Sequence, residues 1–107
     1  MGLNFSLLYV NDGQPTYVLQ ENITHNLTIM AEAAGIYDVL WHPEVIHAKD
    51  LVETLEEGLA KLEKTPEFFK TFDSPNGWGK YIHFVPFVRK VLAACKKYPN
   101  SIIEVLR

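Results

Sequence analysis

Two short clusters in the sequence combine residue types that can bind a ligand. The first is Ile23-Thr24-His25-Asn26, where a strand-like alternation gives way to helical spacing. The free N–H groups at the start of a helix attract anions, so His25 and Asn26 could stand beside a phosphate or a carboxylate. The alternative is that Thr24 and Asn26 satisfy those N–H groups themselves as caps. Caps are common, and this second interpretation is favoured.

The second cluster is the segment SPNGWGKY, which ends at Tyr81. Gly77 and Gly79 permit a tight loop and a close approach of the backbone to another group. Trp78 and Tyr81, with the region of Trp41, offer aromatic surfaces on which a base or a peptide can stack. The alternative is that Trp78 fills the core at a corner between two helices. We favour the corner, with ligand contact as an added role, and expect Trp78 to be buried with one exposed edge and Gly79 to face whatever approaches.

A third polar group surrounds Pro43 and comprises Trp41, His42, Glu44 and His47. Histidine and glutamate both bind metal ions. However, His42 and His47 do not have the i, i+4 spacing of a helical zinc pair, and no cysteine lies nearby. The sequence therefore predicts no metal site and no cofactor.

Catalysis has little support in the spacing of the reactive residues. The one cysteine, Cys95, lies about three helical turns beyond His83, too far for a Cys–His pair on one helix. Cys95 continues an apolar stripe and is predicted to be a buried hydrophobe. Asp38, Glu44 or a histidine could serve in acid–base chemistry, but no spacing constrains a pair, so no catalytic residue is assigned.

Alternating, β-favouring residues predict three strands, over 4–10, 16–23 and 102–106. Asp12-Gly13 between the first two is typical of a hairpin turn. The last strand has to return to this hairpin, because an isolated strand cannot satisfy its backbone hydrogen bonds.

Helical spacing predicts three helices between the hairpin and the last strand. The first begins near Leu27 and ends at Gly35, with one more turn before Pro43. The second begins near Ala48 and contains Gly58, which indicates a close crossing by another element. Thr65 and Pro66 then restart the chain, with three phenylalanines expected to be buried: Phe68, Phe69 and Phe72.

The third helix carries Tyr81, Val88 and Cys95, and it contains Pro86, which is tolerated near a helix start and otherwise kinks the helix. The predicted order is β-β-α-α-α-β. We therefore expect an α+β fold, a single domain over 1–107, with a three-stranded antiparallel sheet covered by helices on one face.

Composition excludes two classes of partner. The chain has 107 residues, a net charge of −3 and dispersed basic residues, which argues against binding to duplex nucleic acid. No stretch is apolar for long enough to span a membrane, and the first residues lack the features of a signal peptide. We expect a cytoplasmic protein that does not bind membranes.

Three segments resemble a family of short, uncharacterised bacteriophage and prophage proteins. They are NITHNLTIMAEAAGIYDVLW, the helix Ala48–Leu62, and NGWGKY followed by FVPFV, LAAC and YP. The blocks I-T-H-N-L and N-G-W-G-x-Y are the most specific parts. The resemblance implies a phage or prophage origin and a small accessory role in the host cytoplasm, for example in counter-defence. It implies no catalytic residues.

Three functions follow as hypotheses. The favoured one is a non-enzymatic binding protein that occupies a host protein or sequesters a small, nucleotide-like ligand. The others are a small enzyme that uses histidine and carboxylate groups, and a structural component of a phage particle; a homo-oligomer is compatible with each. The predicted ligand-binding residues are Thr24, His25, Asn26, Trp41, Trp78, Gly79 and Tyr81.

Overall fold

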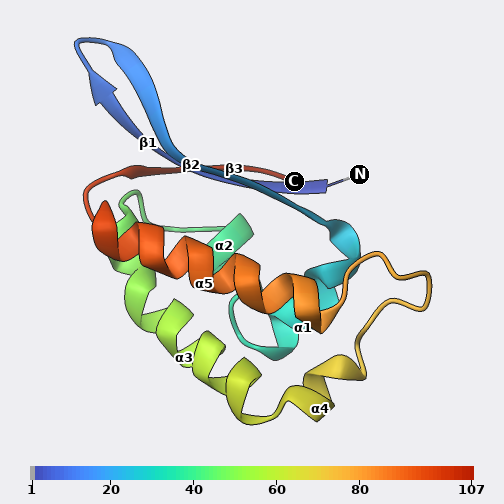
Figure 1. Cartoon of the computed structure of the whole chain (residues 1–107). Coiled ribbons are helices and arrows are strands. Elements are labelled where there is room, and N and C mark those ends of the chain that lie inside the picture. Colours follow the sequence, from blue (N-terminus) through green and yellow to red (C-terminus); the bar gives the residue numbers. More distant parts are fainter. Residues whose placement is uncertain (1) are drawn as a thin grey trace.

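The computed structural model describes residues 2–107 and contains three strands and several helices (Figure 1). Its elements, in chain order, are β1 (Gly2–Asn11), β2 (Gln14–Thr24), the 3₁₀ turn η1 (His25–Leu27), α1 (Thr28–Ala33), α2 (Tyr37–Trp41), the 3₁₀ turn η2 (Ala48–Leu51), α3 (Val52–Lys64), α4 (Pro66–Lys70), α5 (Tyr81–Lys97) and β3 (Ile102–Leu106).

The three strands form one antiparallel sheet in the order β2-β1-β3. Asp12 and Gly13 make the hairpin turn with φ values of 52° and 77°, as a turn with two left-handed residues requires. β3 pairs with β1 from Asn4 to Leu8. The predicted α+β class and the return of the last strand to the hairpin are confirmed.

The hairpin is longer than the sequence predicts. Pairing between β1 and β2 continues to Asn11 and Gln14 at the turn, whereas β3 accompanies β1 only as far as Leu8. The outer part of the hairpin is therefore a two-stranded ribbon that projects past the helices (Figure 1). Its side chains are mostly exposed, so hydrophobic patterning alone does not mark its limits.

All helices lie on one face of the sheet, and α5 runs between the sheet and α3 (Figure 1). Leu3, Phe5 and Leu7 of β1 are fully buried against this layer. Trp41 of α2 is also fully buried, and its ring stacks on Phe87 of α5 with a centroid distance of 5.9 Å. The core thus lies between the inner face of β1 and the apolar side of α5.

Gly58 marks a close crossing, as predicted. A Cβ atom at this position would lie 2.2 Å from Cγ2 of Ile36, a residue that is itself fully buried. Ile36 follows Gly35, which ends the first helical segment with a φ of 77°. The segment between α1 and α2 therefore packs directly on the backbone of α3.

The segment around α4 departs from expectation. Phe68 is 55% exposed, whereas burial of all three phenylalanines was predicted. α4 is a short helix of 5 residues, so only one side of it can face the core, and Phe69 occupies that side. Thr65 also differs, because its hydroxyl donates to the carbonyl of Lys61 instead of capping α4.

The third predicted helix, α5, continues through Pro86 to Lys97. Pro86 lies in the second turn, where its missing N–H removes only the bond to the carbonyl of Ile82. Over residues 2–107, no helix combines the length and apolar character needed to cross a membrane.

Candidate ligand-binding site

The two clusters singled out in the sequence contact each other. Asn26 Nδ2 donates a hydrogen bond of 2.9 Å to the carbonyl of Trp78, although the two residues are 52 positions apart. Gly79 is buried, and a Cβ atom there would lie 2.8 Å from Cγ2 of Thr24. With its φ of 97°, Gly79 lets the loop 71–80 rest on η1. The group that approaches Gly79 is therefore the protein's own turn.

The loop 71–80 is held by its own polar groups. The Asn76 carboxamide oxygen accepts from the backbone N–H of Trp78 at 2.9 Å and from the Ser74 hydroxyl at 2.6 Å. Asp73 Oδ1 accepts from the N–H of Tyr81 at 2.7 Å, which fixes the start of α5. These bonds hold the backbone of Trp78 without using its indole ring.

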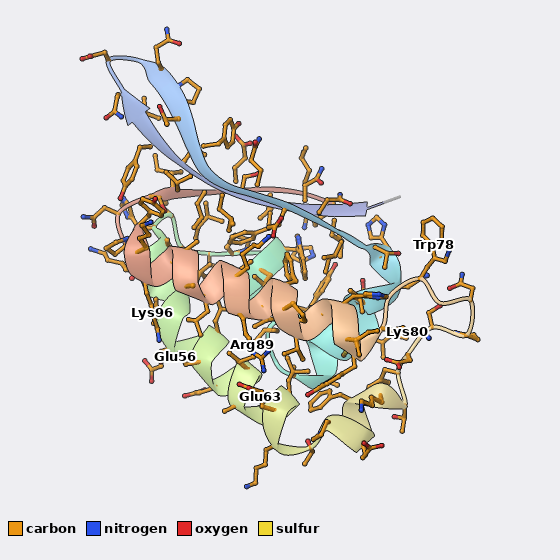
Figure 2. The ribbon with its side chains drawn as sticks, viewed as in Figure 1. Glu56, Glu63, Trp78, Lys80, Arg89 and Lys96 are labelled. Atoms are coloured by element: carbon orange, nitrogen blue, oxygen red, sulfur yellow. The ribbon has the colours of Figure 1, made fainter. Side chains whose placement is uncertain are left out.

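Trp78 is 71% exposed, so the prediction that it fills the corner between two helices is wrong. Figure 2 shows its ring standing clear of the ribbon. The corner is occupied instead by Gly79, which packs on η1, and by Tyr81, whose hydroxyl donates to the carbonyl of Leu62 at 2.8 Å. With the corner closed by its neighbours, the Trp78 side chain is left to the surface.

A pocket of about 500 Å³ lies beside Trp78, between the end of β2, the loop 71–80 and the first turns of α5. We call it the Trp78 pocket. Its apolar lining includes Ile23, Leu27, Trp78, Pro86 and Phe87. Its size lies within the range of small-molecule sites, which are mostly apolar with a few polar groups.

The charged groups of the Trp78 pocket are Glu21 on β2 and Lys90 on α5. Lys90 Nζ lies 2.8 Å from Glu21 Oε1, and the side chains are 63% and 22% exposed, respectively. Because Lys90 is largely exposed to water, the ion pair stabilises the fold by only about 0.2–1 kcal/mol. The contact between β2 and α5 at this point can therefore be exchanged for another at little cost.

His83 also lines the Trp78 pocket, two turns before Lys90 on the same helix. Its Nδ1 accepts a hydrogen bond of 3.3 Å from the backbone N–H of Lys80. A neutral imidazole that accepts at Nδ1 carries its proton on Nε2. His83 can therefore donate a hydrogen bond from Nε2.

At the strand-to-helix junction, the capping interpretation holds for Thr24. Its hydroxyl oxygen accepts from the N–H of Asn26 at 3.3 Å. The Asn26 side chain donates a hydrogen bond to the Trp78 carbonyl and does not act as a helix cap. His25 lies beside both but outside the lining of the Trp78 pocket.

The structure divides the seven predicted binding residues. Thr24, Trp78 and Gly79 line the Trp78 pocket, whereas the others do not: His25, Asn26, Trp41 and Tyr81. Trp41 is fully buried, so it cannot share a stacking surface with Trp78, and that part of the prediction is wrong. Asn26 and Tyr81 still act on the site, because they position the loop that carries Trp78.

The prediction missed the contribution of α5 to this pocket, namely His83, Pro86, Phe87 and Lys90. These residues stand at i, i+3, i+4 and i+7, so their common helix face could have been found from spacing. What the spacing does not tell is that this face meets the end of β2.

The histidines around Pro43 make contacts with the end of the chain. His42 contacts the Arg107 guanidinium, with 3.1 Å between Nε2 and Nη1, and His47 forms a bridge with Ile102. Within residues 2–107, no three His, Cys, Asp or Glu side chains gather to hold a metal ion.

Cys95 is fully buried, as predicted. Burial raises the pKa of its thiol from 9.0 to about 11. The thiol is therefore protonated near neutral pH and is not a nucleophile there.

Comparison with known proteins assigns no family. No family model, curated protein or solved structure matches the chain. The resemblance to short phage proteins therefore stays a prediction, and the function has to be argued from the geometry of the Trp78 pocket.

Proposed function

We propose that the protein is a non-enzymatic binding protein that holds a small, nucleotide-like ligand in the Trp78 pocket. The observation that carries this proposal is the exposed indole of Trp78 at the rim of an apolar pocket. Its backbone is fixed on both sides, by Asn26 at the carbonyl and by Asn76 at the N–H. The backbone that carries the ring is thus held in place before a ligand binds, which lowers the entropic cost of ordering this loop on binding.

A planar aromatic ring is the ligand feature that fits this arrangement best. Stacking of a nucleobase on an aromatic side chain contributes about 1–3 kcal/mol and tolerates different bases. Pro86 and Phe87 provide apolar surface in the same pocket. Lys90 and His83 add polar groups that can fix the orientation of the ligand.

Two features favour binding over acid–base catalysis. The carboxylate in the Trp78 pocket, Glu21, is paired with Lys90. The acidic residues considered for catalysis, Asp38 and Glu44, line a different hollow beside α2. A reaction would need an acid and a base within hydrogen-bond reach of one ligand atom.

The biological setting of the proposal rests on the family resemblance. A small protein of phage origin that sequesters a nucleotide-like molecule would withdraw it from the host, which suits an accessory role such as counter-defence. The Trp78 pocket supports the binding part of this role, and the resemblance supports the setting.

A host protein is the second candidate partner. Trp78, on the loop before α5, and Ile82, in the first turn of α5, are 71% and 64% exposed and are four residues apart in the sequence. Exposed aromatic and aliphatic side chains of this kind often anchor protein interfaces.

Nuclear magnetic resonance tests the proposal directly, because the chain has only two tryptophans. Nucleoside monophosphates are titrated while the two indole N–H signals are observed; Trp78→Phe identifies which signal belongs to Trp78. We expect the Trp78 signal to shift and that of buried Trp41 to change little.

Phe68→Ala is the matched control, since it removes another exposed aromatic side chain outside the pocket. Trp78→Ala should abolish the response in the remaining resonances, and Phe68→Ala should preserve it. If no nucleotide moves the Trp78 signal, the small-ligand proposal fails, and recovery of a host protein that depends on Trp78 would favour the second candidate.

A further inference from the structure

We infer that the ligand of the Trp78 pocket carries a negatively charged group that binds Lys90 and competes there with Glu21. This inference rests on the proposed function and adds the charge of the ligand to it. It follows from the unequal exposure of the two partners and from the hydrogen-bonding capacity that each group in the pocket retains.

Glu21 and Lys90 are not equivalent partners. The Glu21 side chain is mostly covered, at 22% exposed, and its Oε1 is already paired at 2.8 Å, whereas that of Lys90 is 63% exposed. A positively charged ligand would have to compete with Lys90 for this covered carboxylate. A negatively charged ligand meets an exposed ammonium. This group has three N–H donors, and Glu21 Oε1 accepts from one of them.

The hydrogen bonding of His83 also favours a negatively charged ligand. Because its Nδ1 accepts from the backbone of Lys80, its Nε2 is left as a donor. Both polar groups with remaining capacity on the α5 side of the pocket, His83 and Lys90, therefore donate hydrogen bonds. Donors of this kind recognise a phosphate or carboxylate oxygen.

The spacing along α5 relates this charge to the aromatic ring. His83 and Lys90 are seven residues apart, which is about 10 Å along a helix axis. Gly77, Trp78 and Gly79 line the pocket together with His83, the first of these two residues on the helix. A ligand that stacks on Trp78 and reaches Lys90 must be elongated, with a ring at one end and an anionic group at the other.

Glu21 should oppose such a ligand. Its carboxylate lies within hydrogen-bond distance of Lys90 and repels a second negative charge at the same ammonium. Removing the charge of Glu21 should therefore strengthen binding of an anionic ligand, although it removes an ion pair of the protein. A purely structural ion pair would show no such gain.

The test compares AMP with adenosine, which share the ring and differ in the phosphate. Calorimetric affinities are measured for the unaltered protein, Lys90→Gln and Glu21→Gln. Matched controls come from a second exposed ion pair between α3 and α5, Lys96 with Glu56 at 3.1 Å (Figure 2). Lys96→Gln and Glu56→Gln make the same changes in net charge outside the pocket.

We expect AMP to bind about tenfold more tightly than adenosine, as for one charge-assisted hydrogen bond partly exposed to water. Lys90→Gln should bring the two affinities together. Glu21→Gln should strengthen AMP binding about threefold and leave adenosine unchanged, and the two controls should change either affinity by less than about twofold.

Equal binding of AMP and adenosine to the unaltered protein would overturn this inference and leave the proposed function standing. Weaker AMP binding in Glu21→Gln, with an unchanged melting temperature, would overturn it too, because Glu21 would then be an acceptor for the ligand. Absence of binding by both compounds would overturn the inference and the proposed function together.

Discussion

The two tryptophans lie in regions of the molecule that differ in burial and in packing. Trp41 is enclosed between the sheet and α5, whereas Trp78 stands on a loop at the surface. The regions meet at Phe87, which stacks on Trp41 with one part of its surface and lines the Trp78 pocket with another. Burial of aromatic area at Trp41 stabilises the fold, whereas the aromatic area of Trp78 remains accessible at the surface.

Replacing each tryptophan by alanine should give the largest difference between the two regions, in the free energy of unfolding. Trp41→Ala should lower the free energy of unfolding by about 3–5 kcal/mol, because it removes a fully buried ring and leaves a cavity. Trp78→Ala should lower it by less than about 0.5 kcal/mol, as for other exposed positions. Urea denaturation followed by circular dichroism measures both. Equal costs would mean that Trp78 packs into the fold after all.

The next effect concerns the glycines on either side of Trp78. Gly79→Ala should cost about 2–3 kcal/mol, because it combines a φ of 97° with a Cβ placed 2.8 Å from Cγ2 of Thr24. Gly77→Ala should cost about 1 kcal/mol, since its φ is 80° but no atom beyond the two neighbouring residues lies within 4 Å of the added Cβ.

Gly77→Ala is thus the matched control for the contact between the loop and η1. Gly79→Ala should also shift the Trp78 indole resonance, because the loop has to move away from Thr24. If Gly79→Ala lost the expected stability but left the Trp78 signal unchanged, the contact of Gly79 with Thr24 would not determine the position of Trp78.

The contrast between the tryptophans also shows what the sequence can and cannot predict. Periodicity placed the three strands, the crossing at Gly58 and the burial of Cys95, because each depends on local spacing or on one apolar face. Trp78 was predicted wrongly because several neighbouring residues could have filled the corner before α5. Gly79 and Tyr81 fill it, and no periodic pattern tells which of the three residues is buried there.

The candidate site was predicted only in part for a related reason. Thr24, Trp78 and Gly79 stood out because caps, glycines and tryptophans have local signatures. Lys90 and Glu21 carry no such signature, since a charged residue on a helix or a strand is usually solvated. Their pairing depends on where α5 crosses the end of β2, which is a tertiary property.

Cys95 gives a smaller effect, with a pH dependence that tests burial on the core side. Cys95→Ala should cost about 1 kcal/mol near neutral pH. Burial raises the thiol pKa from 9.0 to about 11, so the unfolded chain loses this proton at lower pH than the folded protein does. The resulting stabilisation is complete below about pH 9 and is lost as the pH rises through about 11.

The unaltered protein should therefore lose more stability than Cys95→Ala between these two pH values. Comparing the variant with the unaltered protein cancels the titration of tyrosines and lysines common to both. Parallel pH profiles for the two proteins, or rapid labelling of Cys95 by a thiol reagent in the native state, would contradict its burial.

The smallest expected effect compares two ion pairs of α5, one in the Trp78 pocket and one on the side of α3. Lys90→Gln and Lys96→Gln should each change the free energy of unfolding by only about 0.2–1 kcal/mol, because both lysines are more than half exposed. High salt should reduce the difference from the unaltered protein in both cases. Thermal melts at low and high ionic strength measure this. If Lys90→Gln were instead several times more destabilising than Lys96→Gln, the ion pair with Glu21 would be needed to hold β2 against α5. The Trp78 pocket would then contribute to the stability of the fold, as the core around Trp41 does.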